Sequence, residues 1–222
     1  MEIAFPFRYF TDNGFDVDIV TPKGGKAAVY HSGKISDELA QIQGSKSFVE
    51  KTQNTLPAGK IRSTDYAAIY YPGGHGQYWD VIPDVRIAAA AAAIHESGGV
   101  IGAAGHGTAS LVNVRLSDGR YLVENKRMTC FPWWAEKQWM NISDYGKLLP
   151  FDMQEELLKR MANLVVSTKE TMNDKSLVLV SDDANRLVTG SFASSAKPVA
   201  AEMHRLLIAN KAAAAPRPAT GT

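Results

Sequence analysis

The sequence is poor in cysteine and has no strong charge bias. Cys130 is the single cysteine, so the chain cannot form an internal disulfide, which fits a reducing compartment such as the cytoplasm. The 24 basic and 23 acidic residues nearly cancel, leaving a net charge of +1. This balance argues against nucleic acid or an anionic membrane surface as a partner. We therefore expect a cytoplasmic protein that binds neither.

Long apolar runs are absent as well. The longest, from Ile87 to Ile94, is far shorter than the ~20 residues that a membrane-spanning helix needs. The first ten residues carry Glu2 and Arg8 and lack the apolar stretch of a secretory signal. With 45% hydrophobic and 21% charged residues, the composition is that of one ordinary soluble domain.

Apolar patterning alternates between strands and helices along the chain. Strands are predicted at 15–20, 66–71, 100–104, 127–131, 177–180 and 186–189, and helices at 3–12, 36–43, 45–55, 83–97, 151–163 and 195–210. This alternation predicts an α/β fold with a doubly wound, mostly parallel sheet, helices on both faces, and ligands at the carboxyl ends of the strands. We expect residues 1–210 to form one domain and 211–222 to be a disordered tail.

One expected element has no counterpart in this pattern. Doubly wound folds normally open with a strand that becomes central in the sheet, whereas Met1 here directly precedes the first predicted helix. Omitting a central strand leaves backbone groups unpaired, at about 1–3 kcal/mol for each one that is buried. We therefore expect the first strand to be missing from this chain. Either the chain starts too late, or another chain or a rearranged sheet fills the place.

The most informative stretch, residues 100–111, reads VIGAAGHGTASL. An apolar run ends in small residues and a histidine and then continues into a predicted helix, which is how a sharp strand-to-helix turn is encoded. Such a turn usually presents a nucleophile beside backbone N–H groups that bind an oxyanion. The nucleophile position is Gly105, which has no side chain, and His106 follows it.

A second glycine-rich loop, Pro72–Gly76, follows the predicted strand 66–71 and suits close backbone approach. His75 in this loop either lines the pocket or makes a simple loop contact. We expect no metal site, because the remaining histidines show no paired ligand spacing. These are His31, His95 and His204.

Taken together, several segments resemble the ThiJ/PfpI-like branch of the class I glutamine amidotransferase-like superfamily, most closely its glyoxalase III and stress-chaperone group. The segments are GFDVDIVTPKGG at 14–25, DYAAIYYPGGHG at 65–76, AAGHGTASL at 103–111, MTCF at 128–131 and LVTGSFASSA at 187–196. Their order and spacing carry the resemblance, which covers nearly the whole chain. At 103–111, AVCHGPAAL would be typical of that family.

The resemblance implies a flavodoxin-like fold and a cofactor-free conversion of methylglyoxal to lactate, begun by attack of a cysteine thiolate on the aldehyde. That cysteine corresponds to Gly105 and the catalytic histidine to His106. Glu2, four residues before Pro6, corresponds to the acid that hydrogen-bonds the cysteine. A thiol needs such partners because its ordinary pKa of about 8.5 leaves little thiolate at neutral pH.

Further roles follow from the same resemblance. Glu136, five residues after Phe131, would orient the histidine, although Pro132-Trp133-Trp134 departs from the family pattern. Gly73, Gly74 and the backbone N–H of His106 would form the oxyanion site. The resemblance also implies a small aldehyde as ligand, a homodimer and no cofactor.

The sequence departs from the family at the atom that forms the bond, because glycine at 105 cannot form a hemithioacetal. We therefore expect covalent catalysis to be lost or impaired. Cys130 is interpreted as a buried structural cysteine, with a displaced nucleophile as the alternative. Two other functions stay open. One is a non-catalytic stress or chaperone-type protein, and the other an amidotransferase-like or peptidase-like hydrolase, which also needs the missing nucleophile.

Overall fold

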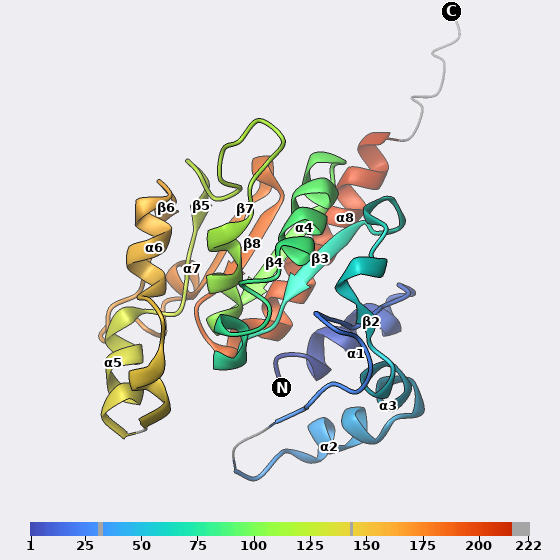
Figure 1. Cartoon of the computed structure of the whole chain (residues 1–222), viewed down its shortest axis with the longest axis horizontal. Coiled ribbons are helices and arrows are strands. Elements are labelled where there is room, and N and C mark those ends of the chain that lie inside the picture. Colours follow the sequence, from blue (N-terminus) through green and yellow to red (C-terminus); the bar gives the residue numbers. More distant parts are fainter. Residues whose placement is uncertain (31–32, 143, 215–222) are drawn as a thin grey trace, which may run out of the picture.

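A computed structural model describes residues 1–30, 33–142 and 144–214 (Figure 1). Its α-helices are α1 (Ala4–Asp12), α2 (Asp37–Gly44), α3 (Lys46–Gln53), α4 (Val85–Glu96), α5 (Trp133–Ile142), α6 (Met153–Lys159), α7 (Lys175–Val178) and α8 (Ala196–Ala214). Its strands are β1 (Val20–Thr21), β2 (Leu56–Pro57), β3 (Ala68–Tyr71), β4 (Val100–Ala104), β5 (Arg127–Met128), β6 (Asn163–Leu164), β7 (Leu179–Asp182) and β8 (Leu187–Gly190). The chain is an α/β protein with mostly parallel sheets.

The main sheet has the order β3-β4-β8-β7. Strands β3, β4 and β8 are parallel, and β7 runs antiparallel to β8. The register pairs Tyr71 with Ala103 and Ala104 with Gly190, so these three strands end at the same edge of the sheet. The loops that follow them therefore meet there, where open α/β sheets carry their ligands.

Strand β4 is covered on both faces, and all five of its residues are buried. Ile101 belongs to the apolar cluster that includes Ile94 of α4, whereas Val100 packs with Met203 of α8. Because successive side chains of a strand point to opposite faces, α4 and α8 lie on opposite sides of β4 (Figure 1). This burial fixes the position of the turn that follows β4.

The strand predicted at 15–20 forms only in part. The ladder is confined to β1, which pairs in parallel with β2, while Leu56 N–H donates to the carbonyl of Ile19. Among the described strands β3 pairs with β4 alone, so β1 and β3 are not joined by a ladder. Alternating FDVDIV favours an extended chain, but a strand also needs a partner for its backbone groups.

Other boundaries also differ from the sequence prediction. Residues 177–178, predicted as strand, lie in α7, the helix predicted at 151–163 ends at Lys159, and the strand predicted at 127–131 is limited to β5. The helix predicted after β4 is a 3-10 helix, Gly105–Asn113. Helix α8 continues through Ala214, four residues into the expected tail, because alanine and lysine favour the helix; residues 215–222 lie outside the described residues. In the described part of the chain, no helix is long and apolar enough to cross a membrane.

Acid is expected to destabilise the fold through His95 in α4. This side chain is buried, and its Nδ1 has no hydrogen-bond partner among the described residues. Burial, assisted by the charge of Arg186, lowers the pKa of His95 to about 4. As pH falls from about 6.5 to 4, the His95 side chain takes up a proton in the unfolded chain but not in the folded one. The folded state therefore loses stability in that pH range.

Allowing for solvent screening, protonation of His95 in the unfolded chain is expected to lower the free energy of unfolding by about 2 kcal/mol. Urea unfolding at a series of pH values measures it. A His95→Leu chain is expected to show a correspondingly smaller loss between pH 6.5 and 4. The same pH slope in both chains would contradict the assignment.

Candidate active site

The turn after β4 begins at Gly105, whose φ of +54° lies in the left-handed region. Glycine adopts this conformation without strain, whereas a residue with a Cβ atom pays about 1–2 kcal/mol. The turn was predicted from the change between apolar and small residues, and the structure places it at the sheet edge where β3 and β8 also end.

Glu2, at the chain start, reaches the space beside this turn. A Cβ atom built on Gly105 would lie 2.8 Å from Glu2 Oε1, and one built on Gly73 would lie 1.8 Å from the same oxygen. The backbone N–H of Gly73 favours the ionised form of this carboxylate and so acts to lower the pKa of Glu2. Burial nevertheless raises the pKa of Glu2 above its usual value. The structure thus brings Glu2, Gly73 and Gly105 close together.

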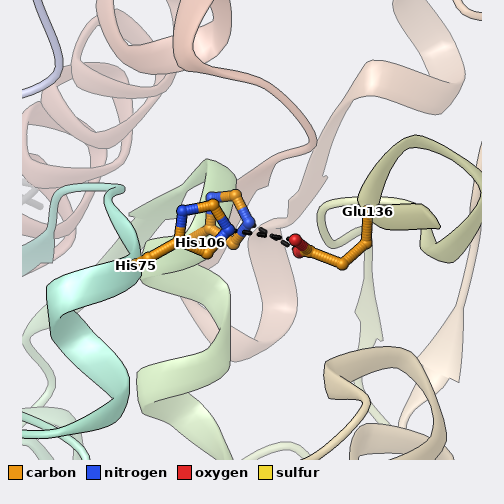
Figure 2. A group of neighbouring side chains, drawn as sticks. All are labelled: His75, His106 and Glu136. Carbon is orange, nitrogen blue, oxygen red and sulfur yellow. Dashed lines mark hydrogen bonds and ion pairs between the residues drawn. The ribbon is translucent and has the colours of Figure 1, made fainter. Parts of the chain in front are cut away.

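His106 lies next to Gly105 and contacts a buried carboxylate. Its Nε2 is 2.7 Å from Glu136 Oε2, and His75 Nε2 is 2.9 Å from Glu136 Oε1 (Figure 2). Glu136 comes from α5, His106 from the 3-10 helix after β4, and His75 from the short 3-10 helix His75–Tyr78 after β3. His106 and Glu136 are therefore in direct contact, and the orienting role of Glu136 stays a prediction.

The electrostatics of this cluster favour an ionised Glu136 beside a neutral His106. Burial alone would raise the pKa of Glu136, but the hydrogen bonds to His106 and His75 outweigh it and hold the pKa at about 2. Burial lowers the pKa of His106, and the Glu136 carboxylate offsets this only in part. A neutral imidazole at this position is suited to accept a proton or to bind a cation.

Aromatic rings hold the histidines in place. The His106 ring stacks on Phe131, with ring centres 4.3 Å apart and an interplanar angle of 30°. Its centre is 3.9 Å from that of His75, and Trp139 meets His75 edge-on at 6.3 Å. With its ring packed in this way and its Nε2 bonded to Glu136, His106 has little rotational freedom.

The glycine loop has a more specific arrangement than the sequence indicates. Gly74 has a φ of +116°, a conformation that only glycine adopts readily. The Gly73 N–H faces the Glu2 carboxylate, so an oxyanion at this place would compete with Glu2 for it. Oxyanion binding by Gly73 and Gly74 stays a prediction.

Cys130 lies away from solvent in the main core cluster and is fully buried. Burial raises the pKa of its thiol well above the ordinary value. A thiol in such surroundings is a poor source of thiolate at neutral pH. This favours the structural interpretation of Cys130 over a displaced nucleophile.

Sequence reasoning missed the direct contact between His75 and Glu136. The sequence left open whether His75 lines the pocket or makes a simple loop contact, and it predicted no helix at 133–142. One signal was present: Pro132 precedes α5 and its carbonyl accepts from Glu136 N–H, as is common at a helix start. The adjacent tryptophans obscured the helical pattern.

Comparison with known proteins shows the family of this chain. The model of the DJ-1/PfpI family matches residues 1–148. A probable glutathione-independent glyoxalase of Schizosaccharomyces pombe, hsp3104, is 30% identical over 165 residues, covering 74% of this chain and 72% of that protein. A putative glutathione-independent glyoxalase of the same organism, hsp3105, is 26% identical over 91% of this chain and 80% of its own length.

Solved structures show the same fold. Glyoxalase III from Candida albicans aligns with a TM-score of 0.79 at 23% identity, covering 92% of this chain and 86% of that chain. Rapid Encystment Protein 24 KDa from Francisella tularensis aligns with a TM-score of 0.80 at 24% identity, covering 93% and 88%. Because the family model matches more than half of this chain, the chain belongs to the DJ-1/PfpI family. Its homologues include proteins named glutathione-independent glyoxalases.

Proposed function

We propose that this protein is a glyoxalase III relative whose site for a small aldehyde has kept its acid and imidazole but lacks the nucleophile. Conversion of methylglyoxal to lactate is then lost or strongly reduced. The observation that carries the proposal is the position of Glu2, whose Oε1 lies 2.8 Å from where a Cβ atom on Gly105 would stand. An acid is in place for a side chain that glycine does not supply.

The neighbouring groups support the same interpretation. His106 follows Gly105 directly and is held by the Glu136 carboxylate at 2.7 Å. In the reaction implied by the resemblance, a cysteine sulfur forms a bond to the aldehyde carbon while the carbonyl oxygen takes a proton. The carbon–sulfur bond cannot form here, because Gly105 has no sulfur and Cys130 is buried in the core. A hydrolase of the amidotransferase or peptidase type needs the same nucleophile.

The proposal includes a flavodoxin-like, doubly wound architecture and a homodimer. The positions of α4 and α8 on opposite faces of β4 support the first. Three large apolar side chains on α5 and the turn after it support the second, because they are exposed by 45%, 77% and 67%. They are Trp139, Ile142 and Leu148.

The test is an assay of lactate formed from methylglyoxal by two chelator-treated chains, the unmodified one and Gly105→Cys. We expect lactate at the uncatalysed rate from the first and a clear gain from the second. A Cys130→Ser chain checks the alternative nucleophile. Activity of the unmodified chain that disappears in Cys130→Ser would overturn the proposal and assign the reaction to Cys130.

A further inference from the structure

The three side chains around Glu136 form a compact set of metal-ligand types. His75, His106 and Glu136 each offer one ligand atom, and these atoms all lie within 4.8 Å of one another. Figure 2 shows both imidazole rings turned with Nε2 toward the same carboxylate. Two histidines and one carboxylate form the protein part of many zinc sites with an open coordination position.

The distances allow a cation to enter with small movements. Each ring faces a different carboxylate oxygen, His75 at 2.9 Å and His106 at 2.7 Å. Around a tetrahedral Zn²⁺ with ligand bonds of about 2.0–2.2 Å, neighbouring ligand atoms lie about 3.4 Å apart. Each distance between a histidine nitrogen and a Glu136 oxygen would therefore lengthen by roughly half an ångström.

The charge of the cluster also favours a cation. Glu136 is 3% exposed, and among the described residues its ion-pair partners are the two histidines, with no lysine or arginine. A buried carboxylate without a compensating charge is costly. A divalent cation held between the two Nε2 atoms and the carboxylate would supply this charge.

From this geometry we infer, in contrast to the expectation from the sequence that there is no metal site, that His75, His106 and Glu136 form a binding site for a divalent transition-metal cation such as Zn²⁺. Three protein ligands leave at least one coordination position for water or a carbonyl oxygen. The inference goes beyond the proposed function, because metal binding requires neither methylglyoxal nor a residue at 105 with a side chain.

The test is calorimetric titration of the metal-free, untagged full chain with ZnCl2, and a parallel titration with CoCl2 followed by visible absorption. We expect one Zn²⁺ per chain, a higher melting temperature with Zn²⁺, and the absorption bands of four-coordinate Co²⁺. His75→Ala and Glu136→Gln are each expected to weaken binding by at least about tenfold, as losses at metal sites typically do. His204→Ala removes a histidine outside the cluster and is expected to bind normally.

Either of two outcomes would overturn the inference. One is no binding of Zn²⁺ or Co²⁺ by the folded chain. The other is binding of equal strength in His75→Ala and Glu136→Gln, which would place the metal elsewhere. If Glu136→Gln does not fold, the comparison rests on the partly exposed His75, through the variants His75→Ala and His75→Gln. Because no aldehyde is present, this result is independent of the lactate assay.

Discussion

Replacing Gly105 with cysteine is expected to raise the rate of lactate formation from methylglyoxal by roughly 100-fold or more, because nucleophiles of this kind carry most of the covalent rate enhancement. The new Cβ would stand 2.8 Å from Glu2 Oε1, so the carboxyl group needs to shift by a few tenths of an ångström. This leaves the acid in contact with the sulfur. The left-handed backbone at 105 adds about 1–2 kcal/mol of strain, which lowers the free energy of unfolding without preventing folding.

Gly105→Ala is the matched control, because it carries the same Cβ and the same backbone strain without the sulfur. We expect it to form lactate no faster than the unmodified chain. Adding Glu2→Gln or His106→Ala to Gly105→Cys is expected to remove most of the gain. If the Gly105→Cys chain has nearly the same melting temperature as the unmodified chain yet forms no lactate, this turn is not the reaction site.

Replacing Gly107 with alanine is expected to lower the free energy of unfolding by about 3 kcal/mol, the upper part of the usual range for overpacking. A Cβ on Gly107 would lie 2.2 Å from the carbonyl oxygen of Tyr71 and 2.6 Å from that of Pro72. These are backbone atoms at the end of β3, so no side-chain rotation relieves the contact. The turn after β4 and the glycine loop after β3 would have to move apart.

Gly76→Ala is the matched control from that loop. A Cβ there meets no atom within 4 Å, and the φ of Gly76 is not positive. Its free energy of unfolding is expected to stay within about 0.5 kcal/mol of the unmodified chain. Urea unfolding of both variants measures the difference. Equal stability of Gly107→Ala and Gly76→Ala would contradict the close approach of the two loops.

Helices with clear local signals were predictable from the sequence. The prediction of 83–97 differs from α4 by two residues at its start and one at its end, because Asp84 caps the start and Gly98 follows the end. The strand predicted at 15–20 was mostly wrong, since an alternating pattern cannot supply the neighbouring strand whose backbone it must bond. Helix α5 was not predicted, because the adjacent Trp133 and Trp134 obscure the helical spacing of apolar residues.

The sequence by itself determined that position 105 carries no thiol and that the single thiol, on Cys130, lies in an apolar segment. It also determined that two glycine-rich turns follow apolar strands. Each of these is a property of the covalent chain or of a few consecutive residues. Only the tertiary structure brought His75 and His106 to Glu136, across 61 and 30 residues of sequence, and Glu2 to Gly105. The physical reason is the parallel register of β3, β4 and β8, which sets distant strand ends side by side at one sheet edge.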